Sequence, residues 1–333
     1  MTTSAASPSP VPRVPGQDPS SARDGQEDSR GNGPKLPTPT LRLHLNDLRH
    51  PASTAFLSLL PDVTSVLETA LSAIIKHLYT PPSLPPSAHP QDAPLTASAA
   101  APATEEKKKQ PCITFTPSIP PTRSVTLVLR DFSGVAYTTG IDLDNDHKEI
   151  HFSLSYIRTW TTRYPDPVSE LAGVLTHELV HCYQHISPPQ APDGDGEPVP
   201  RPPGGLIEGI ADFVRLKAGL VPPHWKRPTG AEDRTDRWDQ GYQHTAFFLE
   251  WLEDVRVGTG AVGMLNDRLL RVGYVGEDDD ASMDGDKEGD GKEGFWKELF
   301  GAGVLQLWEE YGRYLDSLGE KEDRKDTQQT ENK

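Results

Sequence analysis

The chain has 333 residues, enough for one large domain or two small ones, and a formal net charge of −16 at pH 7. This acidic balance argues against a function that depends on non-specific attraction to nucleic acid or to anionic lipid. The two cysteines, Cys112 and Cys182, exclude a disulfide-built miniprotein and a cysteine-rich zinc module, and they fit a reducing compartment.

Residues 1–40 are rich in proline, serine, glycine and charge, with too few apolar side chains to offset the entropy of ordering. We therefore predict a disordered N-terminal arm. The arm has no apolar segment of the kind that a secretory signal needs, so we expect a cytoplasmic protein, with non-classical secretion as the alternative. The most apolar stretch, residues 52–79, is interrupted by Asp62, Glu68 and Lys76 and fails as a membrane span.

The first elements predicted after the arm are a strand at residues 41–45 and a helix at residues 63–79. Leucines alternate with polar residues in the strand, whereas the helix repeats apolar residues at helical spacing. A proline- and alanine-rich insert over residues 80–110 follows, which we predict to be solvated rather than structured. Short β-branched or aromatic runs bounded by proline, glycine or a turn at 144–147 then indicate a small sheet, at residues 112–115, 124–130, 134–137 and 149–154.

Helices dominate the second half of the sequence. A long amphipathic helix is predicted over residues 167–183, with Pro167 in its first turn, and a second one over residues 206–218. Further helical patterns occupy residues 239–255, 261–271 and 295–318. Residues 277–294 form an acidic linker, and residues 319–333 are predicted to be a disordered charged tail. The fold class is therefore α+β, a small mixed sheet with a helix bundle and disordered arms.

The helix over residues 167–183 carries the sequence His177-Glu178-Leu179-Val180-His181, an HExxH motif. Histidines four apart lie one turn apart on the same helix face, so both imidazoles can reach one zinc ion. Glu178 lies beside that position and can take a proton from a water molecule whose pKa the metal lowers. We interpret the motif as a metal site with His177 and His181 as ligands and Glu178 as the catalytic base.

A catalytic zinc needs a third protein ligand, and the pattern favours Glu208. The helix over residues 206–218 is apolar over most of its circumference, which leaves Glu208, Asp212 and Arg215 as a narrow polar stripe. Such a helix is expected to be buried, and its carboxylates then need a metal or a partner. We assign Glu208 as a ligand and Asp212 as the acceptor that fixes the tautomer of a ligand histidine.

Other polar residues near the motif are weaker candidates. His185 lies two turns beyond the first histidine of the motif, too far to share a metal with both histidines on an intact helix. Gln184 and Ser187 occupy the positions where the long metzincin motif has glycine and histidine, which excludes that subclass. Tyr242, with His244 as the alternative, opens the next helix and is our candidate donor to the developing oxyanion. A core aromatic is the competing interpretation of Tyr242.

Four separated blocks of the sequence resemble the plant basic secretory protein (BSP) family, a group of proposed zinc peptidases. They are LTHELVHCYQH, GGLIEGIADFVRLKAG, WDQGYQHTAFFLEWLE and FWKELFGAGVLQLWEEYGRYL. The resemblance implies a zincin-like metallopeptidase domain over residues 41–318, with His177, His181 and Glu208 as zinc ligands and Glu178 as the base. Plant members are typically secreted and basic, whereas this chain is acidic and shows no signal peptide, so their extracellular defence role is not carried over.

The first functional hypothesis is a zinc-dependent peptidase that acts on a peptide or protein substrate, with the small sheet bordering that substrate. A second hypothesis is a non-catalytic interaction protein on a zincin scaffold, but such a protein has no use for Glu178 beside the metal. A third is an aminopeptidase or a hydrolase of small molecules, which would share the same ligands. We expect Zn²⁺ as the cofactor and neither nucleic acid nor a membrane as a partner.

Overall fold

The computed structural model describes residues 35–82, 115–141, 143–189, 199–275 and 294–331, with side chains up to residue 319. Most of the segments predicted to be disordered or inserted, residues 1–40, 80–110 and 277–294, lie outside the described residues. All described residues belong to one compact unit of the chain.

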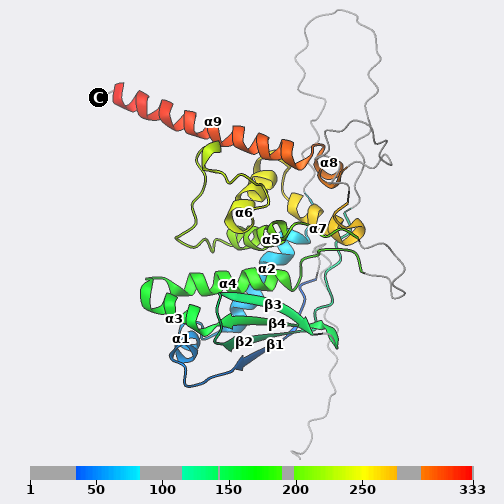
Figure 1. Ribbon diagram of the computed structural model, residues 1–333, viewed down its shortest axis with the longest axis vertical. Helices are drawn as coiled ribbons and strands as arrows, with labels where there is room; N and C mark the ends of the chain where they lie inside the picture. Colours follow the sequence, from blue (N-terminus) through cyan, green and yellow to red (C-terminus); the bar gives the residue numbers. More distant parts are fainter. Residues whose placement is uncertain (1–34, 83–114, 142, 190–198, 276–293, 332–333) are drawn as a thin grey trace, which may run out of the picture. The chain divides into compact units, whose positions relative to one another are not determined.

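The unit contains a four-stranded sheet with the strand order β1-β2-β4-β3 (Figure 1). β1 (Thr40–Leu45), β2 (Ser124–Arg130) and β4 (Asp144–Ser153) are parallel, and β3 (Ala136–Ile141) runs antiparallel to β4 at one edge. The register places Leu127 of β2 between Leu43 of β1 and Ile150 of β4, so these residues share one face of the sheet. That face is apolar and largely buried, as Leu127, Leu129, Ile150 and Phe152 show.

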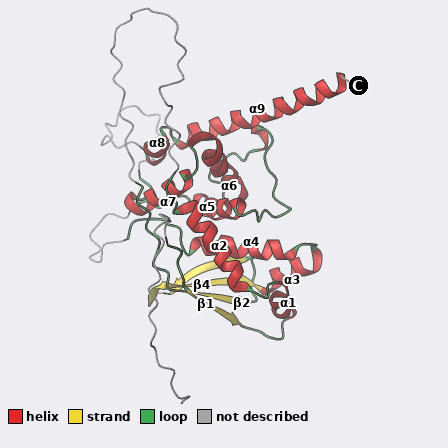
Figure 2. Cartoon of the chain, turned by 180° about the vertical axis from the view of Figure 1, so that it is seen from behind, coloured by secondary structure: helices red, strands yellow, loops and turns green. Residues whose placement is uncertain are grey.

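Helices from the first half of the chain pack on the sheet. α1 (Pro51–Leu59) and α2 (Val63–Leu78) connect β1 to β2, and α3 (Leu154–Arg163) and α4 (Pro167–His181) follow β4. Figure 2 shows α4 between the sheet and the helices of the second half. α4 contacts α2, β3 and β4, and most of its side chains are buried. Its polar side chains, His177 among them, therefore lie in the interior and need partners there.

The second half of the described chain is helical. α5 (Gly204–Lys217) packs on α4 and on α6 (Tyr242–Trp251), and α6 continues directly into a π-helix, Leu252–Val257. α7 (Ala261–Val272), α8 (Phe295–Phe300) and α9 (Val304–Glu331) follow. Aromatic side chains fill the core here; the ring centroids of Phe248 and Trp308, for example, are 5.3 Å apart. This core fixes the positions of α5 and of the start of α6 relative to α4.

Most predicted elements are present within a few residues, and three expectations differ from the structure. The helix expected over residues 295–318 is divided, because Gly301 has a φ of +77° and ends α8 in the left-handed region. α9 continues past residue 319, where we expected a disordered tail; the glutamate, lysine and glutamine residues there are good helix formers. β4 begins at Asp144, so the turn expected over residues 144–147 is wrong. The strand expected at 112–115 lies outside the described residues except for Phe115, which is in no strand.

Two helices, α1 and α3, had no predicted counterpart. α1 is short, and α3 is rich in threonine and aromatic residues, which have low helix propensity, so neither pattern is evident in the sequence. Within the described residues no single helix is both long and apolar enough to cross a bilayer. By length and composition only, α1 and α2 together meet that criterion, with a bend of 64° between them.

Candidate metal centre

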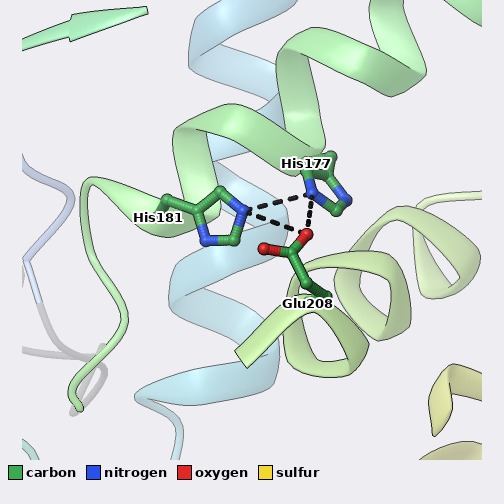
Figure 3. A group of neighbouring side chains, drawn as sticks. All are labelled: His177, His181 and Glu208. Carbon is green, nitrogen blue, oxygen red and sulfur yellow. Dashed lines mark hydrogen bonds and ion pairs between the residues drawn. The ribbon is translucent and has the colours of Figure 1, made fainter. Parts of the chain in front are cut away.

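His177, His181 and Glu208 form a tight group where α4 meets α5 (Figure 3). His177 Nε2 lies 3.1 Å from His181 Nε2 and 3.1 Å from Glu208 Oε2, and His181 Nε2 lies 3.7 Å from the same oxygen. A tetrahedral zinc ion with bonds of about 2.0–2.2 Å needs ligand atoms roughly 3.3–3.6 Å apart. The three side chains therefore fit one such ion with only small adjustments of their positions.

Local features of the sequence fix where α4 and α5 begin. α4 is capped by the carboxylate of Asp166, which accepts a hydrogen bond from Ser169 N at 3.2 Å, and Pro167 lies in its first turn. α5 begins at Gly204, one residue before Gly205. A Cβ on Gly205 would collide with Asp239 O, so glycine here lets the segment before α6 pack against the first turn of α5.

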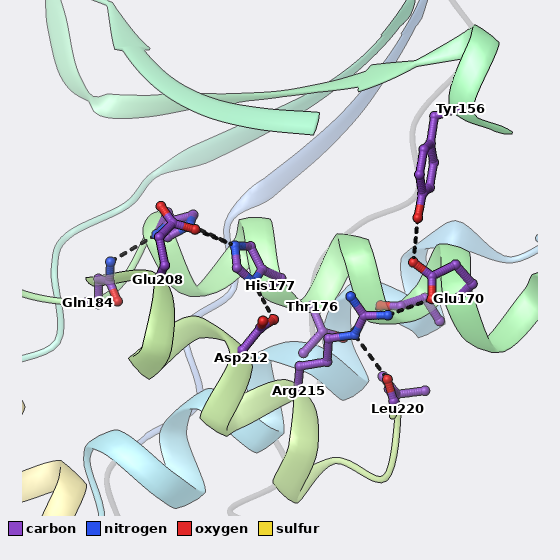
Figure 4. A network of polar contacts seen from close by, with 11 residues as sticks. Tyr156, Glu170, Thr176, His177, Gln184, Glu208, Asp212, Arg215 and Leu220 are labelled. Atoms are coloured by element: carbon purple, nitrogen blue, oxygen red, sulfur yellow. Dashed lines mark hydrogen bonds and ion pairs between the residues drawn. The ribbon is translucent and has the colours of Figure 1, made fainter. Parts of the chain in front are cut away.

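Asp212, one turn after Glu208, binds the other nitrogen of His177: Asp212 Oδ1 lies 2.7 Å from His177 Nδ1, and Asp212 is only 2% exposed (Figure 4). Burial by itself lowers the pKa of His177, but its hydrogen bonds to Asp212 and Glu208 outweigh this effect and raise the pKa to about 10. Burial raises the pKa of Glu208, yet hydrogen bonds to His177 and His181 hold it well below the usual range. Without a metal, a proton on His177 provides the positive charge that these carboxylates require.

Glu178 lies next to the group, and its carboxylate is held by Thr138 of β3. Thr138 Oγ1 lies 2.8 Å from Glu178 Oε2 and 2.8 Å from the backbone oxygen of Glu178. Glu178 is 6% exposed and lines the cleft described below. Thr138 could not be identified from the sequence, because it lies 40 positions before Glu178 and carries no local signature.

Tyr242 stands beside the group at the start of α6. Its ring centroid is 6.1 Å from that of His177, with an angle of 16° between the ring planes. It is 57% exposed, which excludes the competing interpretation as a core aromatic. Its φ of +47° is left-handed, a strained conformation for a residue with a side chain. Burial and then the nearby carboxylates, Glu208 foremost, raise the pKa of Tyr242, so its hydroxyl keeps its proton.

Gln184 and His185, which follow the motif, have different surroundings. His185 is directed away from the group, because its Nε2 lies 2.8 Å from Ser118 O and 3.3 Å from the hydroxyl of Tyr79. Gln184, in contrast, contacts the group: its Nε2 lies 2.9 Å from His181 Nδ1. In the sequence Gln184 is notable only as a departure from the metzincin motif, and no local pattern indicates its contact with His181.

The group opens into a cleft of about 1120 Å³. β3 forms one wall, α4 contributes the motif residues, and α5 with residues 240–244 lies opposite β3. His244 lines the cleft next to Tyr242. β3 is an edge strand, and α4 contacts it along the cleft. An extended chain bound here would lie beside both an edge strand and the candidate metal ligands.

A second polar cluster lies farther from the start of α5 and consists of Tyr156 of α3, Glu170 of α4 and Arg215 of α5 (Figure 4). Arg215 Nη2 donates to Glu170 Oε2 at 2.7 Å, and the hydroxyl of Tyr156 donates to Glu170 Oε1 at 2.7 Å. Arg215 Nε donates to Leu220 O at 3.0 Å. Glu170 and Arg215 are both buried. The polar stripe of Glu208, Asp212 and Arg215 therefore faces α4 over its whole length.

A family model described as "Peptidase of plants and bacteria" (BSP) matches residues 38–311 of the chain. The matched segment contains His177, Glu178, His181, Glu208 and Tyr242 and both walls of the cleft. No curated protein and no solved structure matches the chain.

Proposed function

Because this chain belongs to the BSP family, the peptidases of plants and bacteria, we propose that it is a zinc-dependent peptidase with a zincin-like site. The observation that supports this most strongly is the convergence of two imidazoles and a carboxylate within ligand distance in an open cleft. Two further carboxylates, Glu178 and Asp212, adjoin the group. Three carboxylates in one place, two of them buried, need a cation, and two imidazoles with a carboxylate suit zinc.

Each residue has a role in the proposed reaction. His177, His181 and Glu208 would hold the zinc ion, which when bound lowers the pKa of water to about 7 and polarises a carbonyl group. Glu178 accepts the proton of the attacking water and delivers it to the leaving nitrogen. The Tyr242 hydroxyl, which keeps its proton, donates to the carbonyl oxygen as negative charge develops there.

The proposed substrate is a peptide or protein in extended form. β3 offers a strand edge along the cleft, and an extended peptide can add to such an edge through main-chain hydrogen bonds. Thr138 of β3 also holds Glu178, so the strand that would bind the substrate also positions the base. An aminopeptidase or a small-molecule hydrolase would use the same ligands and would differ in where, or whether, it cuts a peptide.

The test combines metal analysis with a cleavage assay on a broad peptide library. We expect close to one zinc ion per wild-type chain, chelator-sensitive cleavage within peptides, and loss of zinc in Glu208→Ala. Glu178→Gln should retain zinc and lose at least about 10²-fold in turnover, since a general base contributes that much or more.

Three results would contradict the proposal in different ways. Zinc-loaded wild type without turnover favours the non-catalytic interaction protein. Turnover in zinc-loaded Glu178→Gln removes that residue from the mechanism. Cleavage confined to the first peptide bond makes the chain an aminopeptidase.

A further inference from the structure

Gln184 lies three residues after His181, in the turn that ends α4. The backbone fixes this turn, because Gln184 N donates to Val180 O at 2.7 Å and Tyr183 N donates to the same oxygen at 2.8 Å. The side chain of Gln184 is half-buried and lines the cleft. Its position beside His181 therefore follows from the main chain and does not depend on a flexible loop.

The amide of Gln184 makes one contact and leaves one atom without a partner. Its nitrogen Nε2 lies 2.9 Å from His181 Nδ1, while its oxygen Oε1 is buried and has no hydrogen-bond partner among the described residues. A half-turn of the amide exchanges oxygen and nitrogen at almost the same positions. The turned amide places the oxygen at His181 Nδ1 and moves the nitrogen to the position that Oε1 occupied, so the choice between the two orientations depends on His181.

The chemistry of His181 selects the turned amide. A neutral imidazole has one N–H and one lone pair, and the partner of one nitrogen decides which nitrogen carries the proton. An amide N–H pointing at Nδ1 would require the lone pair there and would leave the proton on Nε2, which faces His177 and Glu208. An amide oxygen at Nδ1 instead accepts Nδ1–H and leaves the Nε2 lone pair free for a cation.

We propose that Gln184 is a positioning residue that fixes the metal-binding tautomer of His181 through its amide oxygen. Asp212 stands in the same relation to His177, at 2.7 Å from its Nδ1. The two histidines would then be held by different acceptors, a carboxylate for His177 and a neutral amide for His181. A neutral acceptor avoids adding a fourth carboxylate beside two histidines that already have Glu178, Glu208 and Asp212 near them.

This inference rests on the proposed function only for the presence of the metal, and its test measures zinc affinity rather than turnover. Gln184→Met removes the acceptor and keeps the length of the side chain, whereas Gln184→Glu keeps an acceptor at the same reach. Competition with a chromophoric chelator gives the zinc affinity of each protein. We expect Gln184→Met to bind zinc about 10–100-fold more weakly than wild type, and Gln184→Glu to stay within a few-fold of wild type.

A second measurement reports the tautomer itself. In zinc-loaded protein labelled with ¹⁵N-histidine, we expect the Nδ1–H signal of His181 to be protected from exchange in wild type and Gln184→Glu. In Gln184→Met the same signal should be lost to rapid exchange with water. A purely structural role for Gln184 would not change this signal. Metal-free Gln184→Met should keep the wild-type circular dichroism spectrum, and Gln184→Leu replaces it if it does not fold.

The outcomes separate this inference from the proposed function. Wild-type zinc affinity and a protected His181 signal in Gln184→Met would overturn the role of Gln184 and leave the metal site standing. Equal loss of affinity in Gln184→Glu and Gln184→Met would overturn it too, because the acceptor would then not be what matters. Wild type that binds no zinc would overturn the proposed function and this inference together.

Discussion

Two buried polar clusters join α4 to α5, and only one of them is balanced in charge. The cluster of Tyr156, Glu170 and Arg215 pairs one carboxylate with one guanidinium, and both carboxylate oxygens accept a hydrogen bond. The group around His177 lies about 10.5 Å away along α4, two turns farther, and brings carboxylates to imidazoles at the edge of a cleft. The balanced cluster is complete within the chain, whereas the second requires a proton or a metal ion.

This difference separates a structural role from a functional one better than burial does. Both clusters lie largely in the interior, and residues of both line the same cleft. A buried charge with an opposite partner is stable by itself, while carboxylates in excess remain unfavourable until a cation joins them. We therefore expect the cluster of Tyr156, Glu170 and Arg215 to control stability, and the group around His177 to control metal binding. Substitutions in each cluster can test whether the two roles separate in this way.

The largest effect is expected for Arg215→Met. This change leaves the buried carboxylate of Glu170 without its counterion, which typically costs about 3–5 kcal/mol of unfolding free energy. Denaturant unfolding measures the loss, and elemental analysis of the folded fraction should show the zinc content of wild type. The double variant Glu170→Met/Arg215→Met removes both charges and should recover most of the stability. A stable Arg215→Met that lacks zinc would show that the two clusters act as one.

The pH dependence of the metal-free protein should be the next largest effect. The pKa of His177 rises from 6.5 to about 10 on folding, so its contribution to stability is complete below pH 6.5 and is lost as the pH rises toward 10. The pKa of Glu208 is lowered, so its contribution is present above about pH 4.5 and is lost in acid. Metal-free protein should therefore be most stable between about pH 4.5 and 6.5. Thermal unfolding measured from below pH 4.5 to pH 10 should show the loss of stability on both sides of this range, on the order of a few kcal/mol.

Bound zinc should prevent the loss of stability at alkaline pH. The metal ion replaces the proton on His177, so zinc affinity should increase with pH over the range where metal-free stability decreases. Zinc-loaded protein should then keep its melting temperature as the pH rises from 6.5 to 9. A parallel decrease with and without zinc would mean that the metal does not displace the His177 proton.

Asp212→Asn should weaken zinc binding by about 10–100-fold, the usual effect of removing the carboxylate that orients a ligand histidine. Glu170→Gln is the matched control, because it neutralises one buried carboxylate in the other cluster between the same two helices. It should leave zinc affinity unchanged and lower stability instead. Chelator competition and denaturant unfolding on both variants give the two numbers. Equal zinc loss in both variants would contradict the separation of the clusters.

The sequence alone predicts the parts of this site that depend on helix periodicity. His177 and His181 are four apart, and the stripe of Glu208, Asp212 and Arg215 is evident once the rest of α5 is seen to be apolar. The partners of these residues could not be predicted, since Thr138 comes from a distant edge strand and Glu170 faces Arg215 only after α4 and α5 have packed. Predictions of this kind need the tertiary arrangement, because no local pattern marks an interhelical contact.

Hydrophobic periodicity also does not predict the break between α8 and α9 or the exposed position of Tyr242. Gly301 interrupts the helix through a left-handed conformation that many glycines inside helices do not adopt. Tyr242 has an apolar ring on an apolar helix, and only the turn before α6 brings it out beside His177. The predicted cytoplasmic location concerns neither fold nor site and stays a prediction.

The smallest effect concerns Thr138, which joins the edge strand to the base. Thr138→Val keeps the shape of the side chain and removes the hydroxyl that holds Glu178, so one hydrogen bond to a charged group is lost. We expect kcat to fall about tenfold, equivalent to about 1.4 kcal/mol, while KM and zinc content stay at wild-type values. Thr138→Ser keeps the hydroxyl and should restore most of kcat. A change in KM alone would mean that Thr138 contacts the substrate and does not orient the base.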